Sequence, residues 1–227
     1  MNSLHTIVCN KMTERLEMVK MLRSAGLVLA VMAVLLIAPG GASAALYSGS
    51  TLLPVGSEVV GNNAGNIQFK AAGETQFECT SSKFNAVVTK NPLSGSSKLT
   101  INSFTFNGVG SDGKCATPWG ATRVSMDTPA CFKTVEEKAL WEETGASCSE
   151  PAKLVGITIE SAFTGKCHYS SYQLFNVLGN EPLQFRSQER TMTKDGDSHT
   201  GLCLTSIAMV GTWNVTTASG GSMRYTY

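Results

Sequence analysis

Two of the three histidines in the 227-residue chain lie close to acidic and hydroxyl side chains. His168 lies near Ser170, and His199 follows Asp195 and Asp197 in the stretch KDGDSHTG. A histidine base that is oriented by a carboxylate and paired with a serine is the arrangement of hydrolytic triads. A hydrolase site built from His168 or His199 with Asp195 or Asp197 is therefore one hypothesis. No G-x-S-x-G elbow accompanies these residues, which favours structural histidines and a non-catalytic protein.

The same polar stretch also has the spacing of a calcium-loop start. Asp195, Asp197 and His199 occupy alternating positions, as the first ligands of such a loop do. However, Thr200 stands where the loop needs a glycine, and Ser206 stands where it needs a bidentate glutamate. A turn rich in Asp and Gly explains these residues without a metal. We therefore expect neither a metal ion nor a cofactor.

Cysteines are the remaining reactive residues, and six of the seven lie beyond residue 44. Two pairs share one spacing, because Cys79 precedes Cys115, and Cys167 precedes Cys203, by 36 positions. An even number of cysteines without a CxxC pair predicts structural disulfides in an exported protein. Six cysteines allow many pairings, and the repeated spacing favours three bridges: Cys79 with Cys115, Cys167 with Cys203 and, by elimination, Cys131 with Cys148.

An N-terminal segment predicts export. Leu27–Ala38 is an uncharged apolar run that follows basic residues, and an A-x-A motif at Ala42–Ala44 comes after it. This pattern predicts a secretory signal peptide over 1–44 that is cleaved before Ala45. The run is too short to span a bilayer, so no membrane span is expected after cleavage. Alternative start methionines are Met12, Met18 and Met21.

The remaining chain, 45–227, is expected to form one compact domain that is secreted or held at the cell envelope. Four of the 18 Lys and Arg and two of the 17 Asp and Glu lie in the first 44 residues, so the rest has a formal charge of −1. Such a balance gives no field to attract nucleic acid, and no nucleic-acid partner is expected.

The stretches that position these residues alternate with the period of β-strands. KLTINSFTFNG places Phe104 and Phe106 on one face and Leu99 and Ile101 on the other, and LVGITIESAF and GTWNVTT alternate in the same way. Asn-Gly and Asp-Gly pairs between such stretches suit hairpin turns. We predict an all-β fold, an antiparallel β-sandwich or barrel. The final SGGSMRYTY is expected to pair with GTWNVTT as a last hairpin.

Two further features complete the predicted architecture. The repeated cysteine spacing predicts an internal two-fold repeat near 66–128 and 154–217. One short inserted helix is expected near 131–148, because Thr134 and Glu137 in TVEEKALWEETG match a capping box and Gly145 suits a C-terminal cap. Its acidic residues could imitate a glycosidase pair, but an exposed polar helix face explains them better: Glu136, Glu137, Glu142 and Glu143.

Aromatic side chains suggest binding, because exposed rings can stack on sugars. Trp119 follows Pro118 in a loop-like TPWG stretch, and Tyr169 and Tyr172 lie near the second cysteine pair. These three are the candidate ligand-binding residues, with a polysaccharide or another cell-surface component as the candidate partner. Trp213, by contrast, lies in a strand pattern and is predicted to be core.

Several short motifs resemble a group of small secreted β proteins of high-GC Gram-positive bacteria that have no known function. They are FECTSSKFNAVVTKNP, a GKC followed by PWG, the stretch GKCHYSSYQ, and the closing GLC, GTWNVTT and YTY. The resemblance implies secretion and a two-part β architecture, and it supplies no site residues. Together with the residue patterns it predicts a secreted, disulfide-stabilised, non-catalytic binding or structural protein.

Overall fold

The computed structural model describes residues 43–93, 95–108, 114–117, 120–135, 138–142, 154–171, 173–196 and 202–226. The predicted signal peptide lies almost wholly outside these residues. Strands and turns make up the described chain, and no helix occurs in it. It follows that no described helix is long and apolar enough to cross a membrane.

The strands are β1 (Ser43–Ser48), β2 (Thr51–Leu52), β3 (Glu58–Asn63), β4 (Ile67–Ala71), β5 (Glu74–Cys79), β6 (Ser81–Lys90), β7 (Gly95–Ser96), β8 (Lys98–Asn107), β9 (Cys115–Thr117), β10 (Gly120–Met126), β11 (Ala130–Val135), β12 (Lys138–Glu142), β13 (Val155–Ser161), β14 (Gly165–Ser171), β15 (Gln173–Asn180), β16 (Leu183–Ser187), β17 (Thr191–Lys194), β18 (Ser206–Val210), β19 (Thr212–Thr217) and β20 (Met223–Thr226).

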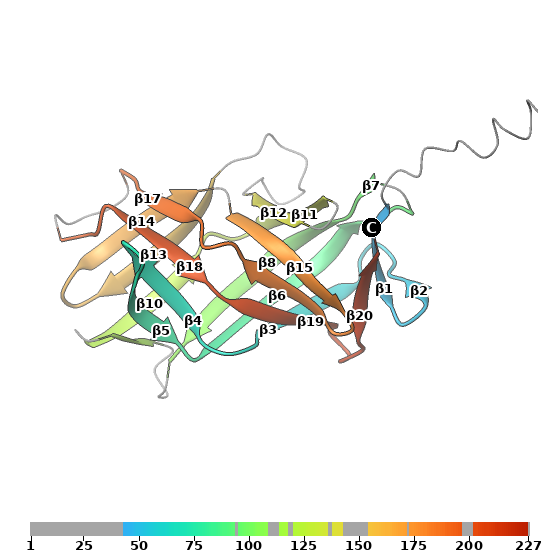
Figure 1. Cartoon of the computed structure of the whole chain (residues 1–227), viewed down its shortest axis with the longest axis horizontal. Coiled ribbons are helices and arrows are strands. Elements are labelled where there is room, and N and C mark those ends of the chain that lie inside the picture. Colours follow the sequence, from blue (N-terminus) through green and yellow to red (C-terminus); the bar gives the residue numbers. More distant parts are fainter. Residues whose placement is uncertain are drawn as a thin grey trace, which may run out of the picture. The chain divides into compact units, whose positions relative to one another are not determined.

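Sixteen of these strands form one antiparallel sheet that closes on itself (Figure 1). One ring follows the order β8, β11, β12, β15, β16, β19, β3 and β6, and a second follows β10, β13, β14, β17, β18, β4, β5 and β9. Consecutive strands such as β5 and β6 or β18 and β19 are separated by one residue and continue from ring to ring. The two rings are therefore the two halves of one barrel of eight long strands, each paired with its neighbours in the chain.

Alternation of buried and exposed side chains explains why these segments form the wall, and one irregularity corrects the sequence-based faces. In β8, Leu99 and Ile101 are buried, Asn102 is exposed, and Phe104 and Phe106 are buried. The pairing of β8 with β6 shifts register at Asn102. Because such a β-bulge moves the following residues to the other face, both apolar pairs point into the barrel.

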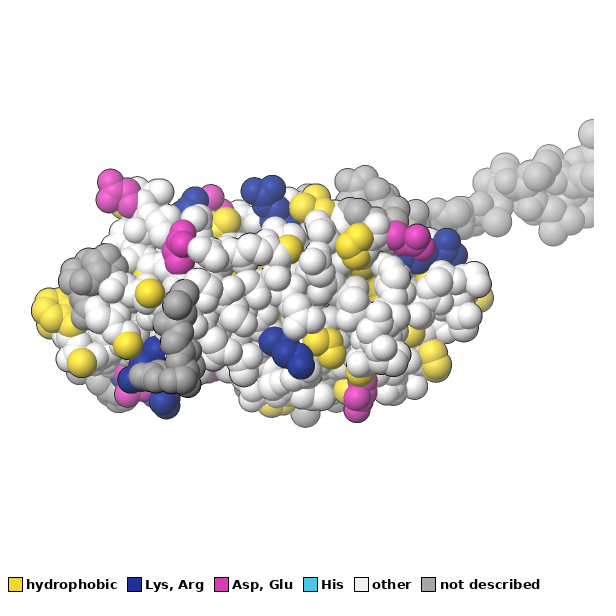
Figure 2. Space-filling model, turned by 90° about the horizontal axis from the view of Figure 1, so that it is seen from below, with side chains coloured by type: hydrophobic (Ala, Val, Ile, Leu, Met, Phe, Trp, Pro, Cys, Tyr) yellow, Lys and Arg dark blue, Asp and Glu magenta, His cyan; other side chains and the backbone are white. Residues whose placement is uncertain are grey.

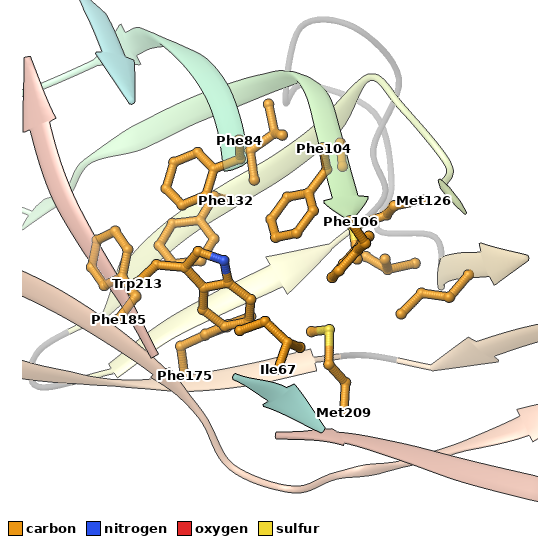
Figure 3. Packing of buried hydrophobic residues seen from close by; sticks show 14 of the residues in the cluster. Ile67, Phe84, Phe104, Phe106, Met126, Phe132, Phe175, Phe185, Met209 and Trp213 are labelled. Atoms are coloured by element: carbon orange, nitrogen blue, oxygen red, sulfur yellow. The ribbon is translucent and has the colours of Figure 1, made fainter. Parts of the chain in front are cut away.

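Aromatic rings fill the barrel interior (Figure 3). Trp213 is 1% exposed, packs edge-on against Phe104 and Phe175, and donates a hydrogen bond from Nε1 to Ser82 Oγ at 3.1 Å. This confirms Trp213 as core. Gly61 faces the Phe84 ring so closely that a β carbon there would collide with it. The interior is a packed core in the half that these residues occupy.

A small second sheet covers one end of the barrel. β1 pairs with β20 and β2 in antiparallel fashion and with β7 in parallel fashion. Leu46 and Leu53 from the start of the chain and Met223 and Tyr225 from its end are buried there. The expected hairpin between β19 and β20 is wrong, because β20 pairs with β1; an isolated bridge joins Thr216 of β19 to Ser222, the residue before β20.

Asn91 fixes this covering sheet to the barrel. Its side chain accepts hydrogen bonds from Leu46 N at 2.9 Å and Ser97 Oγ at 2.7 Å, and donates to Leu46 O and Leu53 O at 2.8 Å each. These bonds are buried, so the sheet is held by directional contacts as well as by apolar packing. We call this end, covered by β1, β2 and β20, the closed end.

The predicted helix near 131–148 is wrong where the structure describes it. Residues 130–135 and 138–142 form the antiparallel hairpin of β11 and β12, with Phe132 opposite Trp141. β11 also pairs with β8, and β12 with β15. The local capping signal at Thr134 therefore yields to sheet pairing on both sides, which completes one ring of the barrel. Residues 143–148 lie outside the described chain.

Disulfides follow the repeated spacing. Cys79 bonds to Cys115, with Cα atoms 4.6 Å apart, and Cys167 bonds to Cys203, with Cα atoms 5.5 Å apart. Cys131 is disulfide-bonded too, and its expected partner, Cys148, lies outside the described residues. The segments 66–128 and 154–217 do not form separate sheets, because both contribute strands to the one barrel. The internal repeat stays a prediction.

Candidate functional site

A cavity of about 240 Å³ lies among strands that Figure 1 places at the end of the barrel opposite the closed end. Its walls come from β5, β9, β10, β13, β14 and β18, from the β13–β14 turn and from the segment before β18. Among the described residues that line it, none is charged. The lining residues are Gln76, Phe77, Thr117, Thr122, Ile159, Ser161, Phe163, Thr164, Cys167, Tyr169, Leu202, Leu204 and Ile207.

Polar groups on this lining are largely bonded to the protein itself. Ser161 Oγ and Thr164 Oγ1 lie 2.8 Å apart and share a hydrogen bond, and Thr164 N donates to Ser161 Oγ at 2.9 Å. Thr117 Oγ1 donates to Gly120 O, and Gln76 Nε2 donates to Glu74 O at 3.3 Å. A ligand would therefore meet a mainly apolar surface.

Three large apolar side chains form the rim of the cavity and also face solvent. Phe163 in the β13–β14 turn is 61% exposed, Leu202 is 60% exposed and Leu204 is 43% exposed. Figure 2 shows hydrophobic side chains at the left-hand end of the molecule, the end at which Figure 1 places β13 and β14. We call these three residues the apolar rim, and this end the open end.

Three consecutive residues of β14 hold the chain after β17 and before β18, and two of the rim residues lie in the part before β18. Cys167 is bonded to Cys203. His168 contacts Asp195 through its side chain, and its carbonyl oxygen accepts a hydrogen bond from Asp195 N at 3.2 Å. Tyr169, which is buried, is hydrogen-bonded by the backbone of Leu204. Successive strand residues point to opposite faces. Cys167 and Tyr169, which line the cavity, therefore hold Cys203 and Leu204 on the inner face of the wall, and His168 holds Asp195 on the outer face.

His168 lies between two carboxylates. Its Nδ1 is 2.5 Å from Asp195 Oδ2, and its Nε2 is 3.0 Å from Asp127 Oδ2. Asp127 follows β10, so its contact with His168 reaches across β13, which runs between β10 and β14. Asp195 follows β17, which pairs directly with β14. Gly156 of β13 makes this approach possible, because a β carbon there would collide with Asp127 Oδ2 and His168 Nε2.

This environment sets the charge of His168. Burial alone would lower the pKa of the imidazole, but the hydrogen bonds to Asp127 and Asp195 and their negative charges outweigh burial and raise the pKa above 6.5. A protonated ring donates from both nitrogens, which matches two carboxylate partners. Both ring nitrogens of His168 therefore face carboxylates, and we call this arrangement the His168 brace.

Burial also sets the acidity of Tyr169. It raises the pKa of the hydroxyl to about 12, although the hydrogen bond from the Leu204 backbone opposes this rise. The phenol is therefore neutral at any ordinary pH. Its ring is 2% exposed, so it serves as a wall of the cavity and not as a stacking platform on the surface.

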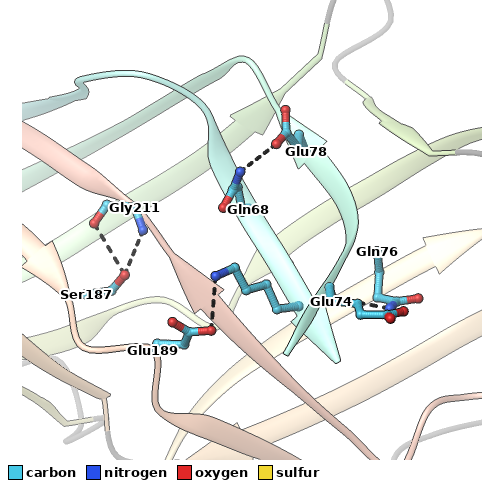
Figure 4. A network of polar contacts seen from close by, with 8 residues as sticks. Gln68, Glu74, Gln76, Glu78, Ser187, Glu189 and Gly211 are labelled. Atoms are coloured by element: carbon cyan, nitrogen blue, oxygen red, sulfur yellow. Dashed lines mark hydrogen bonds and ion pairs between the residues drawn. The ribbon is translucent and has the colours of Figure 1, made fainter. Parts of the chain in front are cut away.

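The outer wall beside the cavity carries a separate set of polar contacts (Figure 4). Lys70 Nζ lies 3.1 Å from Glu189 Oε1, and Gln68 Nε2 donates to Glu78 Oε1 at 2.7 Å. These side chains link β4 to β5 and to the segment before β17. They are exposed or half-buried, so we assign them to the solvated barrel surface.

Several sequence-predicted site residues lie outside the described chain: Trp119, Tyr172, Asp197, His199 and Cys148. Of the others, His168 meets Asp195 as the hydrolase hypothesis requires, and Tyr169 lines the cavity. Asp127 was missed, because it lies 41 residues from His168 and follows an ordinary strand pattern. Neither the cavity nor its rim could be inferred before the ring was known to close.

Comparison with known proteins gives no match: no family model, curated protein or solved structure is similar enough to the chain to assign it a relationship.

Proposed function

We propose that the protein is a secreted, non-catalytic binding protein that takes an uncharged apolar group into the cavity at its open end. The observation that carries this proposal is the mainly apolar lining inside a barrel, in which none of the described lining residues is charged. Barrels of eight strands are just wide enough to hold one small ligand. Ligand sites are typically concave and mostly apolar.

The lining limits the class of ligand. Because most of its polar groups are already bonded to the protein, a polar ligand would gain few new hydrogen bonds and would lose those it makes to water. An alkyl or aryl group loses nothing comparable and gains by leaving water. We therefore assign the site to the hydrocarbon portion of a ligand, with any polar part remaining outside.

Extracellular location is supported by two observations. Disulfides persist in oxidising compartments and are rare in the cytosol, and the chain has two described bridges at the open end. The apolar run and A-x-A motif of the N-terminal segment fit export. The resemblance to small secreted proteins of high-GC Gram-positive bacteria points the same way.

A sugar-binding version of this function receives less support. Sugars stack on exposed aromatic faces, whereas the Tyr169 ring is buried. The polysaccharide hypothesis thus depends on Trp119 and Tyr172, which lie outside the described residues. Binding to insoluble polysaccharide that Trp119→Ala abolishes would favour it over the apolar site.

The test is titration with N-phenyl-1-naphthylamine, an uncharged probe that fluoresces in apolar surroundings. Ile159 lines the cavity and is 7% exposed. We expect saturable binding by the native protein and weaker binding by Ile159→Phe, because the longer ring would project into the cavity and narrow it. Val55→Phe, at the closed end, is the control and should bind as the native protein does. Absence of saturable binding by the native protein would contradict the proposal.

A further inference from the structure

Local hydrogen bonds and a disulfide hold the rim residues in their exposed positions. Phe163 lies in a turn held by the Ser161 and Thr164 hydrogen bonds. Leu202 and Leu204 flank Cys203, which is covalently bonded to Cys167. A mobile apolar side chain would fold back onto the protein, but these positions are restrained beside the cavity that they line. The exposure is therefore a built feature of the open end.

The cavity and the rim are continuous. All three rim residues are both cavity lining and solvent-facing surface, so an apolar path leads from the cavity to the outside. A hydrocarbon chain that entered from water would first have to dissolve in water, which is strongly unfavourable. A hydrocarbon chain that entered directly from an apolar environment in contact with the rim would avoid this step through water.

We propose that the apolar rim docks onto the surface of a lipid bilayer and that the cavity receives the end of a lipid hydrocarbon chain directly from it. This inference rests on the proposed function, of which it names the ligand source. The rim would insert Phe163, Leu202 and Leu204 at the boundary between headgroups and acyl chains, where amphipathic protein surfaces bind.

Charges beside the rim select the type of bilayer. On the outer wall, Glu160 of β13 lies between Arg123 of β10 and Lys166 of β14 in register. Figure 2 likewise shows side chains of both signs dispersed over the visible face. A mixed surface gives no strong attraction to anionic lipids. We therefore assign the docking to a neutral, zwitterionic bilayer, driven by apolar contact.

Co-sedimentation with phosphatidylcholine vesicles tests the inference on the full mature protein. We expect the native protein to sediment with the vesicles and Phe163→Ser and Leu202→Ser each to lower the partition coefficient about tenfold or more, since each removes a large apolar contact. Val55 and Leu93 are 66% and 68% exposed outside the rim. Val55→Ser and Leu93→Ser are therefore matched controls and should change the coefficient less than twofold.

Two outcomes would overturn the inference: no sedimentation of the native protein, or equal losses in rim and control variants. Analytical ultracentrifugation without vesicles identifies the competing occupant, because a dimer that Phe163→Ser dissociates, together with no vesicle binding, would assign the rim to a second copy. The probe titration separates the two proposals. Probe binding without vesicle binding refutes docking alone, and vesicle binding without probe binding refutes the cavity as the ligand site.

Discussion

The two ends of the barrel are built from similar strands, but one is covered by a second sheet and the other contains a cavity. At the closed end, a small sheet buries Leu46, Leu53, Met223 and Tyr225, and buried hydrogen bonds to Asn91 hold it in place. At the open end, two disulfides and the His168 brace hold the wall, and a cavity remains.

This difference separates stability from binding. Apolar burial and satisfied hydrogen bonds complete a core and leave no space for a ligand. Covalent and ionic braces restrain a wall without filling its interior. The open end can therefore keep an unfilled mouth and exposed apolar residues, at a cost in stability that the closed end does not have.

Loss of a disulfide at the open end is expected to have the largest effect. Both described bridges join residues 36 apart, so replacing either pair of cysteines by serine should lower the free energy of unfolding by about 4 kcal/mol in the chain-entropy model. Denaturant unfolding measures this loss. Probe binding should weaken in the variant without Cys167 and Cys203, because Cys167 lines the cavity.

The variant without Cys79 and Cys115 is the matched control for that experiment. Its loop has the same length, but neither cysteine lines the cavity. It should lose the same stability and keep its affinity for the probe. Equal loss of probe binding in both variants would contradict the prediction that only the bridge between Cys167 and Cys203 shapes the cavity.

Asn91→Ala should have the next largest effect, confined to the closed end. It leaves four buried hydrogen-bonding partners without the side chain they share. Leu46 O keeps its hydrogen bond from Leu53 N at 3.0 Å. We therefore expect a loss of about 3 kcal/mol, about 1 kcal/mol for each of the other three buried hydrogen bonds. Hydrogen exchange should accelerate in β1 and β2, whereas probe affinity should be unchanged. Exchange that accelerates equally in β13 and β14 would contradict separate ends.

His168→Gln tests the brace at the open end through the pH dependence of the free energy of unfolding. The pKa of His168 is raised in the folded protein, so its stabilisation is complete below pH 6.5 and is lost as pH rises through the folded pKa. At pH 6 the substitution should cost about 1 kcal/mol, a modest value because Asp127 is partly exposed to water. Urea unfolding from pH 6 to pH 9 should show the native and variant curves converging. A difference that grows with pH would refute the brace.

Exposed apolar residues should give the smallest effect on stability. Phe163→Ser at the open end and Val55→Ser near the closed end each replace a solvent-facing side chain. Both should change the free energy of unfolding by less than about 0.5 kcal/mol. Only the first should lower probe affinity, because only Phe163 lines the cavity. A large thermal destabilisation by Phe163→Ser would show that the rim is part of the core.

How far the sequence predicted this molecule depended on the range of each interaction. The alternation of apolar and polar residues predicted β13 and the core position of Trp213. The equal spacing of two cysteine pairs predicted the two described disulfides. The helix at Thr134 failed because a local capping signal competed with pairing to β8 and β15. The face switch at Asn102 depends on a partner strand. Asp127 joins the site only through the pairing of β10 with β13 and of β13 with β14.

The absence of a side chain at Gly156 has a consequence for homologous sequences. The acidic side chain of Asp127 reaches the imidazole only across a position that has no side chain. A homologue with alanine or a larger residue at this position should therefore lack either the aspartate or the histidine. These three positions should vary together through evolution, as a single inherited character.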